Sequence, residues 1–129
     1  MKKWFLSVFM MLAVLVGVQV SQPGVASAED YYSCTDTSTG YSYYVMTETI
    51  SHLKGSDFYV STREVSADGT YSRVLKWDFG FDEGVCWSEC MTDPALTPPE
   101  RKAVNSPVAL SIIRTAYYYK YGTYHPYTL

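Results

Sequence analysis

The three cysteines, Cys34, Cys86 and Cys90, carry the most reactive side chains of this sequence. If residues 86–90 are extended, Cys86 and Cys90 lie about 13 Å apart, because a strand rises ~3.3 Å per residue. That separation is too large for a disulfide. We therefore expect Cys34 to pair with one of them, which leaves one free thiol that could bridge two chains. If the segment turns after Trp87 instead, Cys86 and Cys90 could pair with each other.

A cysteine beside a histidine would be the reactive pair of a small enzyme. His52 and His125 are the only histidines, one in an expected loop and one in the C-terminal tail. Nucleophilic catalysis needs a base that a third group holds in place, and neither histidine has an evident partner in the sequence. We therefore expect no catalytic residues, two exposed histidines, and cysteines with a structural role.

Metal-binding patterns are equally weak. Cys86 and Cys90 lack the second pair of closely spaced ligands that a zinc site needs. Asp78, Asp82 and Glu83 could hold calcium weakly, but they flank an expected turn, where acidic residues are common. The sequence also contains no phosphate-binding loop, nucleophile elbow or EF-hand loop. We expect neither a metal nor a cofactor.

Tyrosine is the other unusual residue, with 13 copies in the 129 residues. Four of them recur every three residues near the C-terminus: Tyr118, Tyr121, Tyr124 and Tyr127. In a helix this spacing places neighbouring rings near one side. Amphipathic rings suit a surface that stacks on sugars or a partner, and they also suit the edge of a helix–sheet interface. Both interpretations stay open, and the four tyrosines form the candidate binding surface.

The N-terminus has the pattern of an export signal. Two lysines precede an apolar run from Trp4 to Val18, and Ala26-Ser27-Ala28 ends the segment. This order is typical of a cleavable bacterial signal peptide over residues 1–28. The apolar run is shorter than the ~20 residues that a membrane span needs. We expect cleavage before Glu29, no stable membrane span afterwards, and a protein that is secreted, on the cell surface or periplasmic.

The charge balance excludes some partners. The full chain carries 10 basic and 13 acidic side chains, a net charge of −3. The predicted signal peptide holds two lysines and no acidic residue, so the remaining 101 residues carry a net charge of −5. Nucleic acids and anionic membranes select clustered Lys and Arg. We therefore expect no nucleic-acid partner. The length of residues 29–129 is enough for a single domain.

Five segments of the mature chain are rich in the β-branched and aromatic residues typical of strands. They are residues 31–34, 41–50, 58–65, 71–79 and 85–91. An Asp-Gly pair at 68–69 predicts a hairpin between the third and the fourth segment. Alternation in the fourth segment places Leu75, Trp77 and Phe79 on one face, which we expect to lie in the core.

A Pro-rich linker over residues 92–105 separates these strands from one helix. Ser106 and Pro107 are residue types that open helices, and Gly122 predicts an end near Tyr121. Apolar residues recur at helical spacing: Val108, Ala109, Ile112, Ile113, Ala116 and Tyr117. The expected fold is α+β, an antiparallel meander of about five strands with this C-terminal helix packed on one face, followed by a tail over residues 122–129. The opposite face of the sheet could be covered in a homodimer. Alternatively, the Tyr and Thr side chains on that face could be exposed to water.

A family resemblance rests on the first two strand segments and the turn between them. The matching residues are Tyr31, Tyr32, Thr35, Asp36, Gly40, Tyr43, Tyr44, Val45, Thr47, Thr49 and Ile50. Through them the chain resembles surface-adhesin protein E-like domains, small exported bacterial proteins with a run of antiparallel strands, a Pro-containing stretch and a terminal helix. That family tends to carry a cysteine near the helix end that pairs with one in a central strand. The helix expected here has none, so its disulfide must differ.

The resemblance implies a non-catalytic exported α+β domain, and the named members of the family are adhesins that bind host proteins. Together with the missing acid–base and nucleophile motifs, it favours an adhesin-like domain that binds an extracellular protein or glycan. Two alternatives remain. One is a small secreted enzyme that uses a Cys/His pair, and the other is an envelope-associated inhibitor or accessory protein.

Overall fold

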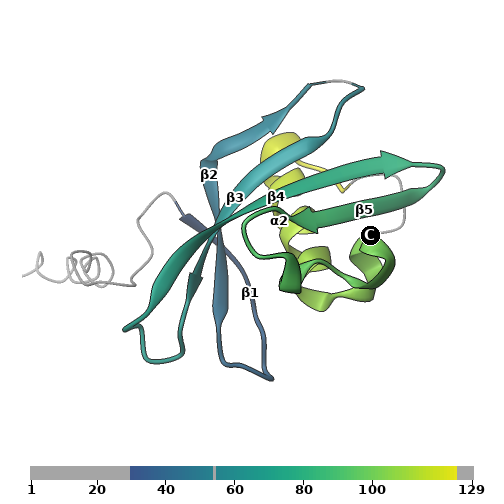
Figure 1. Cartoon of the computed structure of the whole chain (residues 1–129). Helices are drawn as coiled ribbons and strands as arrows, with labels where there is room; N and C mark the ends of the chain where they lie inside the picture. Colours follow the sequence, from purple (N-terminus) through teal and green to yellow (C-terminus); the bar gives the residue numbers. More distant parts are fainter. Residues whose placement is uncertain (1–29, 54, 125–129) are drawn as a thin grey trace, which may run out of the picture.

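The computed structural model describes residues 30–53 and 55–124, which form a five-stranded antiparallel sheet and a C-terminal helix (Figure 1). The strands are β1 (Asp30–Thr35), β2 (Ser42–His52), β3 (Phe58–Val65), β4 (Ser72–Asp82) and β5 (Val85–Cys90), paired in the order β1-β2-β3-β4-β5. Three short 3-10 helices follow, η2 (Pro94–Leu96), η3 (Pro99–Arg101) and η4 (Ala103–Asn105), and then α2 (Pro107–Tyr121). The predicted α+β meander with one C-terminal helix is confirmed.

Some predictions fall outside these residues. The predicted signal peptide over residues 1–28 lies outside the described residues, as do His125 and Tyr127 in the tail. Within the described residues, no helix has the length and apolar composition to cross a membrane.

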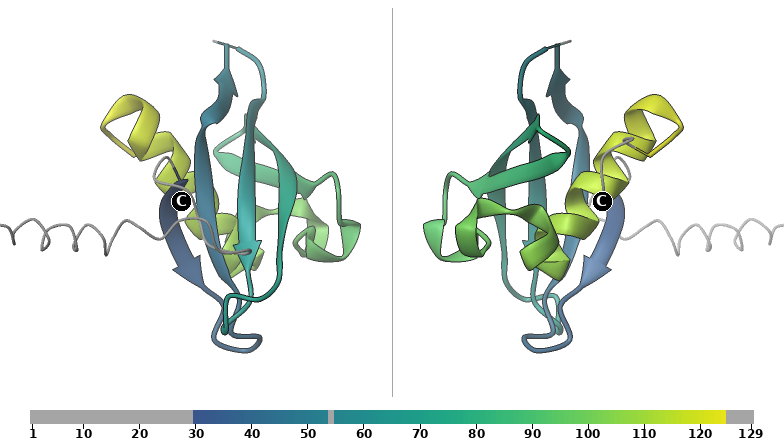
Figure 2. Two further views of the ribbon diagram at one scale, coloured as in Figure 1. Left: turned by 90° about the vertical axis from the view of Figure 1, so that its left-hand side faces the viewer. Right: turned by 90° about the vertical axis from the view of Figure 1, so that its right-hand side faces the viewer.

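The sheet curls into a half-barrel, and α2 packs against β1 and β2 on its inner side (Figure 2). The 3-10 helices lie against β5, at the other edge of the sheet. The predicted inner face of β4 is confirmed, because Leu75, Trp77 and Phe79 are buried. The predicted helix stripe is confirmed too: Ala109, Ile112, Ile113 and Ala116 are buried, with Val108 and Tyr117 packed at the margin.

Both ends of α2 have the capping geometry that the sequence predicts. The Ser106 hydroxyl accepts a hydrogen bond from the Ala109 N–H at 3.2 Å. At the other end Gly122 adopts a left-handed conformation (φ 74°), and its N–H donates to the Tyr118 carbonyl at 2.7 Å. A residue with a Cβ pays a steric penalty in that conformation, so glycine suits the position where the chain leaves the helix.

A bulge in β2 changes which side chains face the core. The pairing with β3 is interrupted between Met46 and Ser51. There the Thr49 hydroxyl donates to the Met46 carbonyl at 2.6 Å and accepts from the Ser61 N–H at 2.8 Å, in place of backbone pairing. Val45 before the bulge is buried, and Ile50 after it packs against the same core. Regular alternation would place these two on opposite faces, so the bulge explains why both faces of this segment carry apolar residues.

A buried carboxylate joins the sheet to the Pro-rich segment. Glu64 in β3 is only 1% exposed. It accepts hydrogen bonds from the Tyr43 hydroxyl at 2.8 Å and from Arg73 Nε at 2.7 Å. The Arg73 Nη2 donates in turn to Asp93 at 2.7 Å, and Asp93 caps η2 by accepting from the Ala95 N–H. The segment predicted as a linker is therefore a folded series of 3-10 helices, held to β3 and β4 by these side chains.

Candidate functional site

The three tyrosines of the predicted row that lie among the described residues do not form a single platform. Tyr118, Tyr121 and Tyr124 are all exposed, but only Tyr118 and Tyr124 stack, with ring centroids 4.9 Å apart and planes at 29°. The chain reverses after Gly122, which folds Tyr124 back onto the last turn of α2. Tyr121 points to a different flank of the helix, where its ring lies 4.6 Å from that of Tyr117.

Tyr121 is fixed to the end of β2 by His52. The Tyr121 hydroxyl lies 2.7 Å from His52 Nδ1, and the imidazole tautomer decides which group donates. The imidazole also lies against the ring of Phe58, with centroids 5.1 Å apart. The prediction that His52 is an exposed loop residue was wrong. β2 continues past Ile50 because His52 pairs with Phe58 in β3, which leaves the imidazole half-buried.

A third flank of the helix end meets β1. Tyr119 is exposed, and its ring centroid lies 5.4 Å from that of Tyr31, which is exposed as well. We call the five exposed rings around the end of α2 the tyrosine surface: Tyr31, Tyr118, Tyr119, Tyr121 and Tyr124. The sequence pattern missed Tyr31 and Tyr119, since the three-residue spacing excludes both. The packing of the helix on β1 is what brings them together.

The three cysteines are free thiols in the structure. Cys34 lies in β1 and the other two in β5, and these are the two outermost strands of the sheet. Cys86 and Cys90 point to the core from one regular strand, so the rise per residue places them about 13 Å apart. No disulfide joins Cys34 to either of them in the structure. Formation of a disulfide after export stays a prediction.

The environment of the thiols disfavours nucleophilic chemistry. Burial raises the pKa of Cys34 and Cys90, and it raises the pKa of Cys86 to about 12. The thiolate is the reactive form, so a raised pKa makes a cysteine a poor nucleophile. The described residues also hold no group of three or more His, Cys, Asp or Glu side chains placed to ligate a metal ion.

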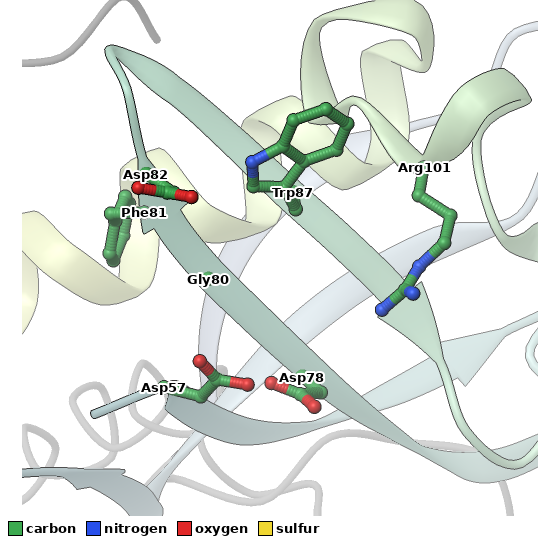
Figure 3. A pocket seen from close by; sticks show the side chains of 7 residues that line it. All are labelled: Asp57, Asp78, Gly80, Phe81, Asp82, Trp87 and Arg101. Atoms are coloured by element: carbon green, nitrogen blue, oxygen red, sulfur yellow. The ribbon is translucent and has the colours of Figure 1, made fainter.

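A cleft of about 270 Å³ opens on the outer face of β4 and β5, away from the core (Figure 3). Asp78 and Asp82 of β4 line it together with Asp57, which directly precedes β3. Trp87 of β5 forms a wall, since it pairs with Gly80 and shares its face, and Arg101 of η3 reaches the rim. The cleft therefore combines carboxylates from two elements with an indole and a guanidinium.

Two of these carboxyl groups, those of Asp57 and Asp78, face each other (Figure 3). Gly80 makes room for the first, because a Cβ at this position would lie 3.2 Å from the Asp57 Oδ1. Burial, followed by the hydrogen bond and charge of Asp57, raises the pKa of Asp78 to about 7. Two carboxylates in contact cannot both ionise freely, so near neutral pH the pair shares a proton.

Arg101 approaches the cleft from a strained backbone. Glu100 and Arg101 both have left-handed φ values, 56° and 59°. Each such residue costs roughly 1–3 kcal/mol when it is not glycine. Arg101 Nη2 bonds Glu89 at 3.1 Å, and its charge opposes the rise in the Asp78 pKa. A protonated and an ionised carboxyl group beside a guanidinium can exchange a proton with a ligand or attract a cation.

The carboxyl pair was missed in the sequence, although a signal for it exists. The hairpin turn at 68–69 places Val65 opposite Ser72, and the same register places Phe58 opposite Phe79. Extending it by one residue puts Asp57 beside Gly80, on the face that Asp78 also occupies. The strand register set by the Asp-Gly turn therefore predicts that the two carboxylates lie close together.

Neither a family model nor a curated protein nor a solved structure matches the chain. The resemblance to surface-adhesin protein E-like domains therefore stays a prediction.

Proposed function

We propose that the protein is an exported, non-catalytic binding domain that holds an extracellular protein or glycan on its tyrosine surface. The observation that carries this proposal is that five exposed rings, from β1, from α2 and from the residues just after α2, surround the C-terminal end of this helix. A tyrosine ring offers apolar area for stacking and a hydroxyl for hydrogen bonding, which is why tyrosine is enriched where proteins bind partners.

The rings are already ordered before any partner arrives. Tyr118 stacks on Tyr124, Tyr119 contacts Tyr31, and Tyr121 is held by His52. Binding therefore needs to immobilise few side chains, and this lowers the entropic cost of association.

The alternatives differ in how much the geometry supports them. An enzyme with a Cys/His pair requires a low-pKa thiol, and burial raises the pKa of all three thiols. An envelope-associated inhibitor or accessory protein would use the same kind of exposed aromatic surface. It would differ from an adhesin only in the partner bound.

The test is to screen residues 29–129 against arrays of extracellular-matrix proteins and glycans. Binding that is lost in a Tyr118→Ser/Tyr124→Ser double variant would support the proposal. Tyr71→Ser is the matched control, because Tyr71 is exposed to the same extent as Tyr118, 45%, but lies next to Tyr41 at the β3–β4 turn. No binding on either array, together with turnover in a panel of hydrolase substrates, would overturn the proposal in favour of an enzyme.

A further inference from the structure

We propose that Asp57 and Asp78 form a proton-dependent latch, which fastens the residue before β3 to the outer face of β4 and closes one side of the cleft. The two groups come from different elements: Asp57 precedes β3, and Asp78 lies within β4 opposite Tyr59. A contact between their carboxyl groups therefore holds the residue before β3 against the outer face of β4. This inference does not depend on the tyrosine surface.

The geometry of the pair requires a proton. The Asp78 Oδ1 is buried, and no hydrogen-bond donor among the described residues reaches it. The Asp57 carboxyl group lies within hydrogen-bonding reach of Asp78. Both groups are acceptors when ionised, so a hydrogen bond between them forms only when one carries a proton.

The absence of a side chain at Gly80 allows Asp57 to lie close to β4. The Asp57 Oδ1 would lie 3.2 Å from a Cβ at position 80, closer than ordinary van der Waals contact. Gly80 sits in the middle of the β4–β5 pairing, where a residue without a side chain weakens a strand. A glycine in a paired strand often marks a close approach of this kind.

Other charged and titratable side chains face the pair. None of those described below removes the need for a shared proton. Glu89 of β5 adds negative charge, and Asp82 lines the same cleft. Tyr59 of β3 has its pKa raised by the charges of Asp78 and Asp57. Arg101 lowers the pKa of Asp78, but it also bonds Glu89. Lys76 lies two residues before Asp78 on the same face of β4. Negative charge therefore dominates around the latch.

Ionisation of both carboxyl groups should break the latch. The raised pKa of Asp78, about 7, places this change near neutral pH. Below it the pair shares a proton and holds Asp57 against β4. Above it the two carboxylates repel each other, Asp57 turns away from Gly80, and the cleft becomes wider and more negative.

Two measurements on residues 29–129, which contain every described element, test the latch. The first is a ¹³C NMR titration of the aspartate carboxyl groups from pH 3 to 9. We expect the carboxyl carbon of Asp78 to shift in a step near pH 7, and the carboxyl carbon of Asp57 to report the same step because the two groups are in contact. Titration of Asp78 near the ordinary aspartate pKa of about 4 would overturn the proposal, and this outcome needs no variant.

The second measurement is the pH dependence of tryptophan fluorescence. Trp87 lines the cleft, whereas Trp77 is fully buried in the core and should not respond. We expect a change in emission near pH 7 that disappears in Asp78→Asn and in Asp57→Asn. Asp82→Asn is the matched control, because it removes a carboxylate of the same cleft and should keep the change. Persistence of the change in Asp78→Asn, or its loss in Asp82→Asn, would contradict the latch.

Discussion

Replacement of Arg73 by methionine should destabilise the protein strongly, because it leaves a buried carboxylate without its cation. The Glu64 side chain is 2% exposed, and Arg73 Nε bonds it at 2.7 Å. Removing one partner of a buried ion pair typically costs 3–5 kcal/mol. Arg73 is 36% exposed, so water already screens part of the attraction. We therefore expect a loss of about 2–3 kcal/mol in the free energy of unfolding, part of it from the lost bond to Asp93.

Urea denaturation at neutral pH measures this loss without adding salt that would screen the pair. Arg101→Met is the matched control, since its bond to Glu89 joins two side chains that are 58% and 45% exposed. Exposed pairs contribute about 0–1 kcal/mol. The double variant Arg73→Met/Glu64→Gln should recover part of the stability, because the uncompensated charge is gone. A loss in Arg73→Met no larger than that in Arg101→Met would refute the reasoning.

The remaining predictions concern pH and the ends of α2. Asp78 has a pKa raised to about 7 in the folded protein, so its contribution to stability is complete below about pH 4 and lost as the pH rises to about 7. Since the group is partly solvated, we expect a fall of about 1–2 kcal/mol across this window in urea titrations, and a flatter profile in Asp78→Asn. Gly122→Ala should cost about 1 kcal/mol because of its left-handed φ of 74°, and should loosen Tyr124 from Tyr118 in aromatic NMR spectra. Ser106→Ala should also cost about 1 kcal/mol by thermal denaturation through loss of the helix cap, and unchanged melting would contradict this role.

Local signals predicted most of the fold. The helix begins at Pro107 and ends at Tyr121 as expected, since its cap and its left-handed stop are both set by residues within one turn. The inner face of β4 followed from simple alternation, because Leu75, Trp77 and Phe79 meet a continuous core.

Features that depend on long-range packing were harder to predict. The bulge in β2 depends on the Thr49 hydroxyl bonding Ser61 in the neighbouring strand, and such a bond has no pattern in one segment of sequence. The 3-10 helices are held against the sheet in part by the hydrogen bond from Arg73 to Asp93, which lie 20 residues apart in the sequence. The split of the tyrosine row likewise follows from where α2 meets β1 and His52, which helical spacing does not specify.

The central claim is that the tyrosine surface binds an extracellular partner. The most direct test is the affinity of residues 29–129 for the strongest ligand on the matrix-protein and glycan arrays, compared between the Tyr118→Ser/Tyr124→Ser and Tyr71→Ser variants. Aromatic anchors at binding surfaces commonly contribute about 2 kcal/mol or more, so we expect the double variant to bind at least about tenfold more weakly. Tyr71→Ser should bind like the unaltered protein. Equal affinities of the two variants would contradict the claim.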